Sequence, residues 1–306
     1  MDMDGEEREK VLLSGSSGML GRAIGAALKR QRVPLLRLVR HEPQNSSEVL
    51  WNPAAGLIDA QALEGAAAAV HLSGANVTER RWTEKYKREM TDSRVQSTRL
   101  LAETLARLSK PPRVLVTASA VGIYGERGDE LLDENSPPGR GYFPDLCHAW
   151  EAAARPAIAC GIRVVHLRFG IVIGKDGGVM ARLAPLFRLG LGGRLGNGRQ
   201  WMSWVSEADV VSAALFALEK TDLAGPVNVV APQPVTNAEF TRVLGQAVHR
   251  PALLPAPAFA LRLAFGEMAD EALLASTRAV PNRLRQAGFV FAHPTLAEAF
   301  AVALGK

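Results

Sequence analysis

The glycine spacing near the amino terminus constrains the fold of this chain more than any other feature. Residues 11–14 form a short apolar run, glycines follow at positions 15, 18 and 21, and residues 19–30 have the pattern of an amphipathic helix. A strand that turns sharply into a helix gathers free N–H groups and the positive helix end at one point, where a pyrophosphate can bind. An ordinary glycine-rich turn has the same glycines, so the flanking strand and helix favour a dinucleotide site.

Short apolar runs alternate with longer amphipathic segments as far as residue 230, which predicts parallel strands covered by helices. The fold class predicted is therefore α/β, a Rossmann-like doubly wound parallel sheet with a smaller, mainly helical C-terminal substrate domain. The runs that predict strands are 11–14, 35–39, 68–73, 113–117, 163–169 and 227–230. The segments that predict helices between them are 19–30, 83–108, 144–160 and 207–220.

Two changes in composition predict the domain organisation. Residues 174–200 are rich in glycine and arginine, and from about residue 231 helical patterns at 236–249, 258–275 and 294–304 replace the strand signal. We predict a disordered lead-in at 1–10, a Rossmann domain made of 11–173 and 205–230, and a substrate domain made of 174–204 and 231–306.

Bulk properties exclude several classes of partner. The chain has 306 residues and a net charge of +5 without a Lys/Arg block, which argues against nucleic-acid binding. Cys147 and Cys160 are the only cysteines, so neither a disulfide framework nor a metal site is expected. The polar amino terminus is unlike a signal peptide, and no apolar run is long enough to cross a bilayer. We expect a cytoplasmic protein, monomeric or homodimeric, that acts on a small molecule.

Residues at two strand ends predict which dinucleotide binds. Arg40 follows the second strand where an acid would grip the ribose of NAD, and a guanidinium there suits the 2′-phosphate of NADP. Two alternatives leave NAD as a possible cofactor: the acid Glu42 lies nearby, and Arg40 can be a solvated arginine that binds no phosphate. Ser73 and Gly74 follow the third strand, and such small residues let a cofactor lie across the sheet.

The strand at 113–117 leads to the two residues predicted to be catalytic, Ser119 and Tyr124. Hydroxyls beside a nicotinamide can polarise a carbonyl or move a proton. The alternatives are that Ser119 bonds backbone at a strand end and that Tyr124 lines the cofactor pocket.

At this point the chain resembles the extended short-chain dehydrogenase/reductases, which include nucleotide-sugar epimerases. The glycine spacing, residues 71–74 and residues 123–125 carry that resemblance. Residues 81–83, 93–95, 150–154, 168–174 and the tail around 265–268, Pro281 and 288–289 resemble its divergent "epimerase family protein" branch, which is often labelled cell-division-inhibitor-like. The resemblance spans residues 11 to 304 and implies cofactor contacts at Gly15, Ser16, Ser17, Gly18, Met19, Leu20, Val39, Arg40, Leu72, Ser73, Gly74, Glu89, Arg94 and Val172.

The chain departs from that superfamily at the residues that usually move the proton. Catalytic members carry a Tyr and a Lys four residues apart, and counting back from Glu151 places these positions at Phe143 and Cys147. No lysine lies between Pro111 and Ile173. Ala120 stands where the usual serine would be.

Two functions follow from this combination. The first is an NADP(H)-dependent oxidoreductase or epimerase that acts on a carbonyl or alcohol, nucleotide-sugar-like in the family. The second is a non-catalytic NADP(H)-binding regulator or redox sensor linked to cell division. An anionic substrate is favoured if several arginines converge at the site, namely Arg168, Arg182, Arg188, Arg194 and Arg199.

Overall fold

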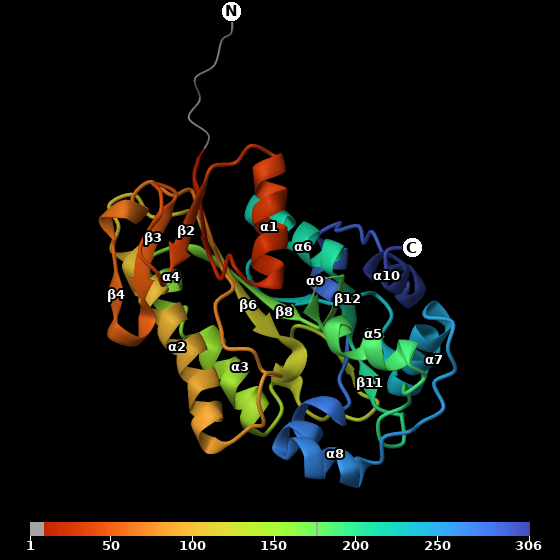
Figure 1. The fold of residues 1–306 in the computed structure, drawn as a ribbon. Coiled ribbons are helices and arrows are strands. Elements are labelled where there is room, and N and C mark those ends of the chain that lie inside the picture. Colours follow the sequence, from red (N-terminus) through yellow and green to blue (C-terminus); the bar gives the residue numbers. More distant parts are fainter. Residues whose placement is uncertain (1–8, 176) are drawn as a thin grey trace, which may run out of the picture.

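The computed structural model describes residues 9–175 and 177–306, and its centre is an eight-stranded sheet (Figure 1). The strand order is β13-β8-β6-β5-β1-β2-β3-β4, and only the edge pair β3–β4 is antiparallel. The bounds are β1 Val11–Ser14, β2 Leu35–Val39, β3 Glu48–Asn52, β4 Leu57–Ile58, β5 Ala68–His71, β6 Val114–Ala120, β8 Arg163–Phe169 and β13 Gly225–Val229. The prediction of a Rossmann-like parallel sheet is confirmed.

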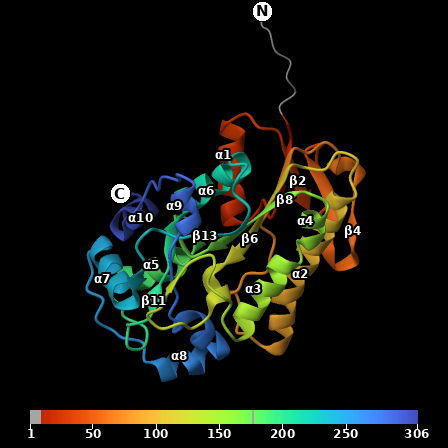
Figure 2. The ribbon, with the colours of Figure 1, turned by 180° about the vertical axis from the view of Figure 1, so that it is seen from behind.

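Helices cover both faces of this sheet, as Figures 1 and 2 show from opposite sides. On one face lie α1 Met19–Arg30 and α6 Glu207–Glu219, and on the other lie α2 Glu84–Ala106, α3 Tyr142–Ala152 and α4 Arg155–Ala159. Successive residues of a strand point to opposite faces, so Leu13 joins the core under α1 while Leu12 joins the core under α2.

Three sequence-based expectations differ from the structure. The helix expected at 144–160 is divided into α3 and α4, because Ala153 and Ala154 leave the helical register before Pro156. The helix expected at 258–275 ends at Phe265, where Gly266 has a φ of 62°. The sequence patterns did not predict strand β3. Its five residues lie near the sheet edge and pair with β2 and the short β4.

The second half of the chain adds a mostly helical region against the carboxyl side of the sheet. It contains α5 Met180–Arg188, α7 Asn237–Ala247, α8 Ala258–Phe265, a π-helical turn Ala269–Leu273, α9 Asn282–Gln286 and α10 Leu296–Ala303. The short strands form small sheets of their own. One has the order β10-β9-β12, with bounds Gly177–Gly178, Ile171–Gly174 and Trp204–Ser206, and another pairs β11 Trp201–Met202 with β14 Val235–Thr236. Strand β7 Leu131–Leu132 pairs with β15 Arg278–Ala279. A core of its own, which includes Trp204, Phe240 and Phe300, stabilises this region.

The predicted lead-in at 1–10 lies mostly outside the described residues. Its last two residues are described. The Glu9 carboxylate accepts one hydrogen bond from each Nη of Arg113 at 2.6 Å, and the carbonyl of Lys10 accepts a hydrogen bond from the N–H of Ala67 at 2.9 Å. None of the helices in the described ranges has the length and apolar character that a bilayer span requires.

Candidate cofactor and active site

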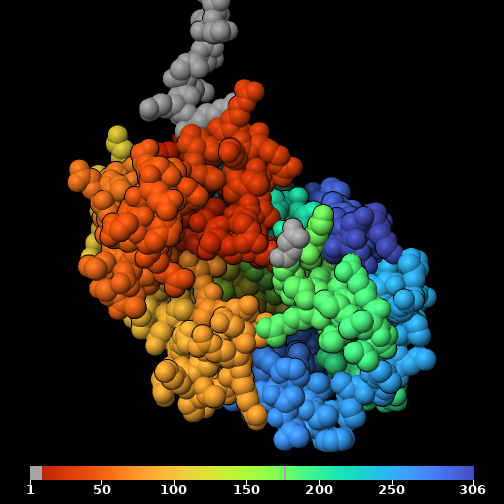
Figure 3. Space-filling model, viewed as in Figure 1, coloured from red at the N-terminus to blue at the C-terminus, as the bar shows by residue number. Residues whose placement is uncertain are grey.

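The carboxyl ends of the parallel strands bring most of the predicted cofactor residues to one edge of the sheet. Strands β2 and β5 flank β1 in parallel register, so the segments after Ser14, Val39 and His71 leave the sheet side by side. The chain winds away from β1 in both directions here, and nucleotides bind in the crevice at such a switch point. Figure 3 shows the surface hollowed between the α1 segment, α2, the α5 region and α8.

The glycine loop itself has the geometry of a phosphate cradle. A Cβ added to Gly15, whose φ is +68°, would lie 2.9 Å from the carbonyl carbon of Leu72, and one added to Gly21 would lie 2.1 Å from the oxygen of Gly15. These glycines therefore let β1, β5 and α1 approach at backbone contact. Gly18 caps α1 without a side-chain hydrogen bond, and the first turn holds no acid. The free N–H groups and the helix dipole at this point favour an anion.

Other predicted contacts lie at the neighbouring strand end and on α2. Val39 is buried at the end of β2 and Arg40 follows it with an exposed side chain. Glu89 is exposed on the first half of α2, and no contact in the described ranges joins it to the glycine loop.

Arg94 of α2 reaches this edge with an unusual environment. Its side chain is 7% exposed, donates to the carbonyl oxygens of Met90 at 3.0 Å and Ala75 at 2.8 Å, and lies over the Trp150 ring. Its Nε is buried with no hydrogen-bond partner among the described residues. Burial lowers the pKa of the guanidinium. Since a Cβ on Gly74 would lie 3.1 Å from its Cζ, Arg94 lies directly against the segment after β5.

A glycine hairpin closes against the glycine loop from the opposite side. It comprises β9, which carries Val172, and the described residues of the turn into β10. A Cβ on Gly177 would lie 2.9 Å from the sulfur of Met19, so the two segments approach this closely because position 177 has no side chain. The structure thus brings Met19 and Val172 to the same crevice.

Ser119 and Tyr124 belong to one buried polar network at the ends of β6, β8 and β13. The hydroxyl of Ser119 donates to Glu151 at 2.6 Å, and that of Tyr124 donates to Asn228 at 2.8 Å. Arg168 holds the network together, because it pairs with both oxygens of Glu151 at 2.8 Å and donates to the Tyr124 hydroxyl at 2.9 Å. Tyr124 is 0% exposed and Ser119 2%, so neither hydroxyl meets the surface of the crevice directly.

The ion pair between Glu151 and Arg168 determines the protonation states in this network. Burial raises the pKa of Glu151, but the hydrogen bonds and charge of Arg168 outweigh burial and the net pKa is lowered. For Arg168, burial lowers the pKa, but the hydrogen bonds and charge of Glu151 raise it by more, so the net shift is upward. Burial raises the pKa of Tyr124, against the opposing effect of Arg168. The network therefore holds a carboxylate, a guanidinium and a neutral phenol near neutral pH.

The same pair corrects one expectation. Arg168 is committed to Glu151 and Tyr124 and is not free to bind a substrate anion. The other four arginines of the predicted set, Arg182, Arg188, Arg194 and Arg199, are exposed.

The positions of the usual Tyr and Lys are apolar here. Phe143 packs edge-on against Trp82 and so closely over Gly122 that an added Cβ would lie 2.4 Å from its ring. Cys147 is fully buried, and burial followed by the charge of Glu151 raises the pKa of its thiol to about 12. The neighbouring Tyr142 donates to the carbonyl of Lys87 at 2.7 Å, away from these positions. The two usual positions on α3 therefore hold neither a tyrosine nor a lysine.

Sequence reasoning missed the contacts that join distant segments. Glu271 of the C-terminal region accepts the N–H groups of Tyr142 at 3.2 Å and Phe143 at 2.9 Å, so it caps α3 from another part of the chain. Asn228 was missed in the same way, since its partner Tyr124 lies 104 residues earlier. A lone acid in a helical tail carries no local signal for such a role.

His71, beneath the segment after β5, gives a pH prediction. Its ring lies between the hydroxyls of Ser14 at 2.7 Å and Ser97 at 3.2 Å, and complete burial lowers its pKa from 6.5 to about 4. Between these values the unfolded chain binds a proton that the folded chain refuses. The free energy of unfolding should therefore fall as the pH falls from 6.5 to about 4, by about 3 kcal/mol in all.

The measurement is urea unfolding at a series of pH values, with NMR titration of the His71 ring. The His71→Gln variant should lose the part of the slope that His71 contributes, and the part from His166, whose pKa burial also lowers, should remain. His41→Gln, at an exposed position, should keep the whole slope. A ring that titrates near 6.5 in the folded protein would contradict the prediction.

Comparison with known proteins places this geometry in a family. The model of the NAD dependent epimerase/dehydratase family matches residues 11–230, and that of a domain of unknown function, DUF1731, matches residues 256–303. An epimerase family protein of Mycobacterium bovis is 47% identical over 293 residues, which cover 96% of this chain and 97% of that protein. The human epimerase family protein SDR39U1 is 34% identical over 95% of this chain and 98% of its own length.

Solved structures agree with the fold. The crystal structure of human SDR39U1 (isoform 2) with NADPH has a TM-score of 0.89 and 32% identity, covering 97% of this chain and 99% of that one. MoeE5 in complex with UDP-glucuronic acid and NAD has a TM-score of 0.74 at 19% identity, over 95% and 96% of the two chains, and supports the fold alone.

Proposed function

Because the chain belongs to the NAD-dependent epimerase/dehydratase family, we propose that it binds NADP(H) at the carboxyl edge of the sheet and transfers hydride between the nicotinamide and a carbonyl or alcohol substrate. The observation that carries the proposal is the backbone-to-backbone contact of Gly15 with Leu72 under the uncapped start of α1. A similar chain was crystallised with NADPH. The cofactor supplies the hydride chemistry, and the protein supplies binding and orientation.

The residues that would hold the cofactor divide by chemistry. The N–H groups of the glycine loop face the pyrophosphate, and Arg40 offers paired donors to a 2′-phosphate. Among the described residues Arg94 has an unpartnered buried Nε and no carboxylate within ion-pair distance, which suits a cation that meets an anionic or hydroxyl-bearing part of the cofactor. Met19 and Val172 would cover the dinucleotide from the hairpin side.

The proton chemistry of the proposed reaction has to differ from that of the superfamily. Phe143 and Cys147 stand at the usual positions, and Tyr142, the tyrosine of α3, donates instead to the carbonyl of Lys87. Ser119 and Tyr124 stay the predicted catalytic hydroxyls. Ser119 can exchange a proton with the Glu151 carboxylate, whereas Arg168 has only donors and orients the Tyr124 hydroxyl without passing on a proton.

Tyr124→Phe tests this role. The change removes two hydrogen bonds of a buried hydroxyl and should lower the free energy of unfolding by about 1–2 kcal/mol. If the phenol moves the proton, single-turnover hydride transfer should also fall by about 100-fold or more. Stopped-flow NADPH fluorescence measures the second effect, and binding of NADPH should be unchanged. A variant that is only less stable, with an unchanged hydride-transfer rate, would leave Tyr124 a purely structural role.

One observation favours a second function, a non-catalytic NADP(H)-binding regulator. It is the presence of Phe143 and of buried Cys147 at the positions of the usual Tyr and Lys. The two functions are separated with NADPH labelled stereospecifically at C4. Loss of the label from one face to a member of a carbonyl library supports the enzyme. A silent library, together with a partner protein recovered only in the presence of NADPH, supports the regulator.

A further inference from the structure

A second cavity lies in the C-terminal region, away from the cofactor crevice. It has a volume of about 730 Å³ and is formed by α7, the segment 249–255 and Arg194. This volume lies within the usual range for small-molecule sites. Figures 1 and 2 both show α7 on the side of the molecule opposite β2 and the edge strands.

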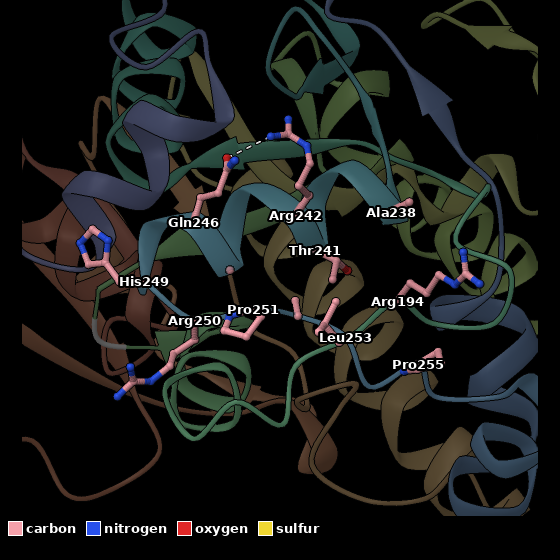
Figure 4. Close-up of a pocket in the computed structure, with 12 residues that line it drawn as sticks. Arg194, Ala238, Thr241, Arg242, Gln246, His249, Arg250, Pro251, Leu253 and Pro255 are labelled. Atoms are coloured by element: carbon pink, nitrogen blue, oxygen red, sulfur yellow. Dashed lines mark hydrogen bonds between the residues drawn. The ribbon is translucent and has the colours of Figure 1, made fainter.

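The charge around this cavity has one sign. Arg194, Arg242, His249 and Arg250 line it, and no Asp or Glu is among the described lining residues. The Lys306 ammonium adds a further cation 2.9 Å from the His249 ring. Figure 4 shows the long basic side chains around the rim of the cavity.

The residues that form the two walls of the cavity are mostly small and apolar. Ala238, Thr241 and Gly245 of α7 form one wall, and Pro251 and Leu253 form the other (Figure 4). Leu253 is 78% exposed, so apolar surface remains available to a ligand. The combination of apolar walls and a basic rim suits a molecule that has an apolar body and an anionic group.

The two walls meet at the carboxyl end of α7, where a Cβ added to Gly245 would lie 2.9 Å from the carbonyl oxygen of Arg250. His249 ends α7 in the left-handed region with a φ of 55°, a conformation that normally favours glycine. The N–H of Arg250 then donates to the carbonyl of Gly245 at 2.9 Å, which turns the chain back along the helix. A strained residue at the rim of a cavity is a common feature of binding sites.

Helix-end electrostatics account for only part of this charge. Arg250 and Lys306 lie at the carboxyl end of α7, where cations offset the helix dipole. Arg242 lies within the helix, and Arg194 comes from a different segment. Arg194 makes no side-chain hydrogen bond or ion pair within the described ranges. Arg242 donates through Nη1 to the side-chain oxygen of Gln246 at 3.0 Å (Figure 4), and its contact with Glu239 is a long 3.9 Å between exposed groups. The Arg194 guanidinium is therefore available to a ligand, as are the remaining N–H groups of Arg242.

We propose that this cavity is a second binding site, separate from the cofactor crevice, for an organic anion with an apolar body. The ligand lies on the Ala238–Thr241–Gly245 wall, and Arg194 and Arg242 close over its anionic group. This inference is independent of the proposed function, since none of these residues lines the cofactor edge.

The experiment is a fluorescence titration of the full chain, with and without saturating NADPH, using 1-anilinonaphthalene-8-sulfonate as the probe. We expect saturable binding of one probe that NADPH does not displace and that salt weakens. The Arg194→Ala/Arg242→Ala variant should bind the probe roughly tenfold or more weakly, because two charge-assisted contacts are lost. The Arg194→Lys/Arg242→Lys variant should retain most of the binding.

Two controls make the result specific. The Arg99→Ala/Arg285→Ala variant also removes two exposed arginines and should bind the probe like the wild type. The neutral analogue N-phenyl-1-naphthylamine should bind at least roughly tenfold more weakly than the sulfonate. Equal binding of the neutral analogue, displacement by NADPH, or an equal loss in the control variant would each overturn the proposal.

Discussion

Arg168→Leu should lower the free energy of unfolding by about 3–5 kcal/mol, the cost of leaving a buried charge without its partner. The variant leaves the Glu151 carboxylate, 13% exposed, with only the Ser119 hydroxyl as a side-chain hydrogen-bond donor among the described residues. It also removes a donor to Tyr124. Urea unfolding at pH 7 measures the loss.

The pH dependence of that loss identifies its cause. In the wild type Arg168 holds the pKa of Glu151 below 4.5, so the pair stabilises the fold above 4.5 and its contribution is lost as the pH falls through the lowered value. In the variant, burial without the guanidinium raises the pKa of Glu151 above that of the unfolded chain. The deficit should therefore shrink as the pH is lowered from this raised value towards 4.5.

Two further variants serve as controls for the ion pair. Arg113 forms a comparable bidentate pair with Glu9, but the two side chains are 70% and 58% exposed. Arg113→Leu should therefore cost no more than about 1 kcal/mol. The double variant Glu151→Leu/Arg168→Leu removes both charges and should be more stable than Arg168→Leu alone. A double variant as unstable as the single one would show that packing, not charge, sets the loss.

This network marks the limit of what the sequence could predict. The glycine loop, the strand and the helix that follow it are contiguous, so local spacing was enough to place Gly15 and Gly18. Glu151 lies 32 residues after Ser119 and 17 residues before Arg168, and Asn228 is more distant still. Their meeting depends on the order β13-β8-β6, which no local pattern encodes.

The same reasoning explains the smaller errors. Periodicity identified α1 and α2 to within two residues at either end, because each has a continuous buried stripe. It missed β3, which has only five residues and alternates buried with partly or fully exposed positions at the sheet edge. It also carried one helix through Gly266, where a positive φ ends α8. Weak or short patterns are overridden by tertiary contacts.

Arg40→Ala should weaken the binding of NADPH roughly 30- to 100-fold and leave the binding of NADH almost unchanged. Arg40 is exposed and follows the carboxyl end of β2, next to the strand β1 that leads into the glycine loop. A 2′-phosphate held by a guanidinium makes paired, charge-assisted hydrogen bonds of about 2–3 kcal/mol, and NADH lacks that phosphate. The preference for NADPH over NADH should therefore disappear with this one side chain.

Fluorescence titration with both nicotinamides, at low and at high salt, measures the change. Arg40→Lys should keep only part of the preference, because an ammonium holds the phosphate as a point charge without the planar pair of donors. Arg30→Ala, at the far end of α1, removes the same charge at an exposed position and should leave both affinities unaltered. An equal loss of NADPH and NADH affinity in Arg40→Ala would mean that the residue supports the loop and does not read the phosphate. The choice between NADP and NAD would then rest on another group.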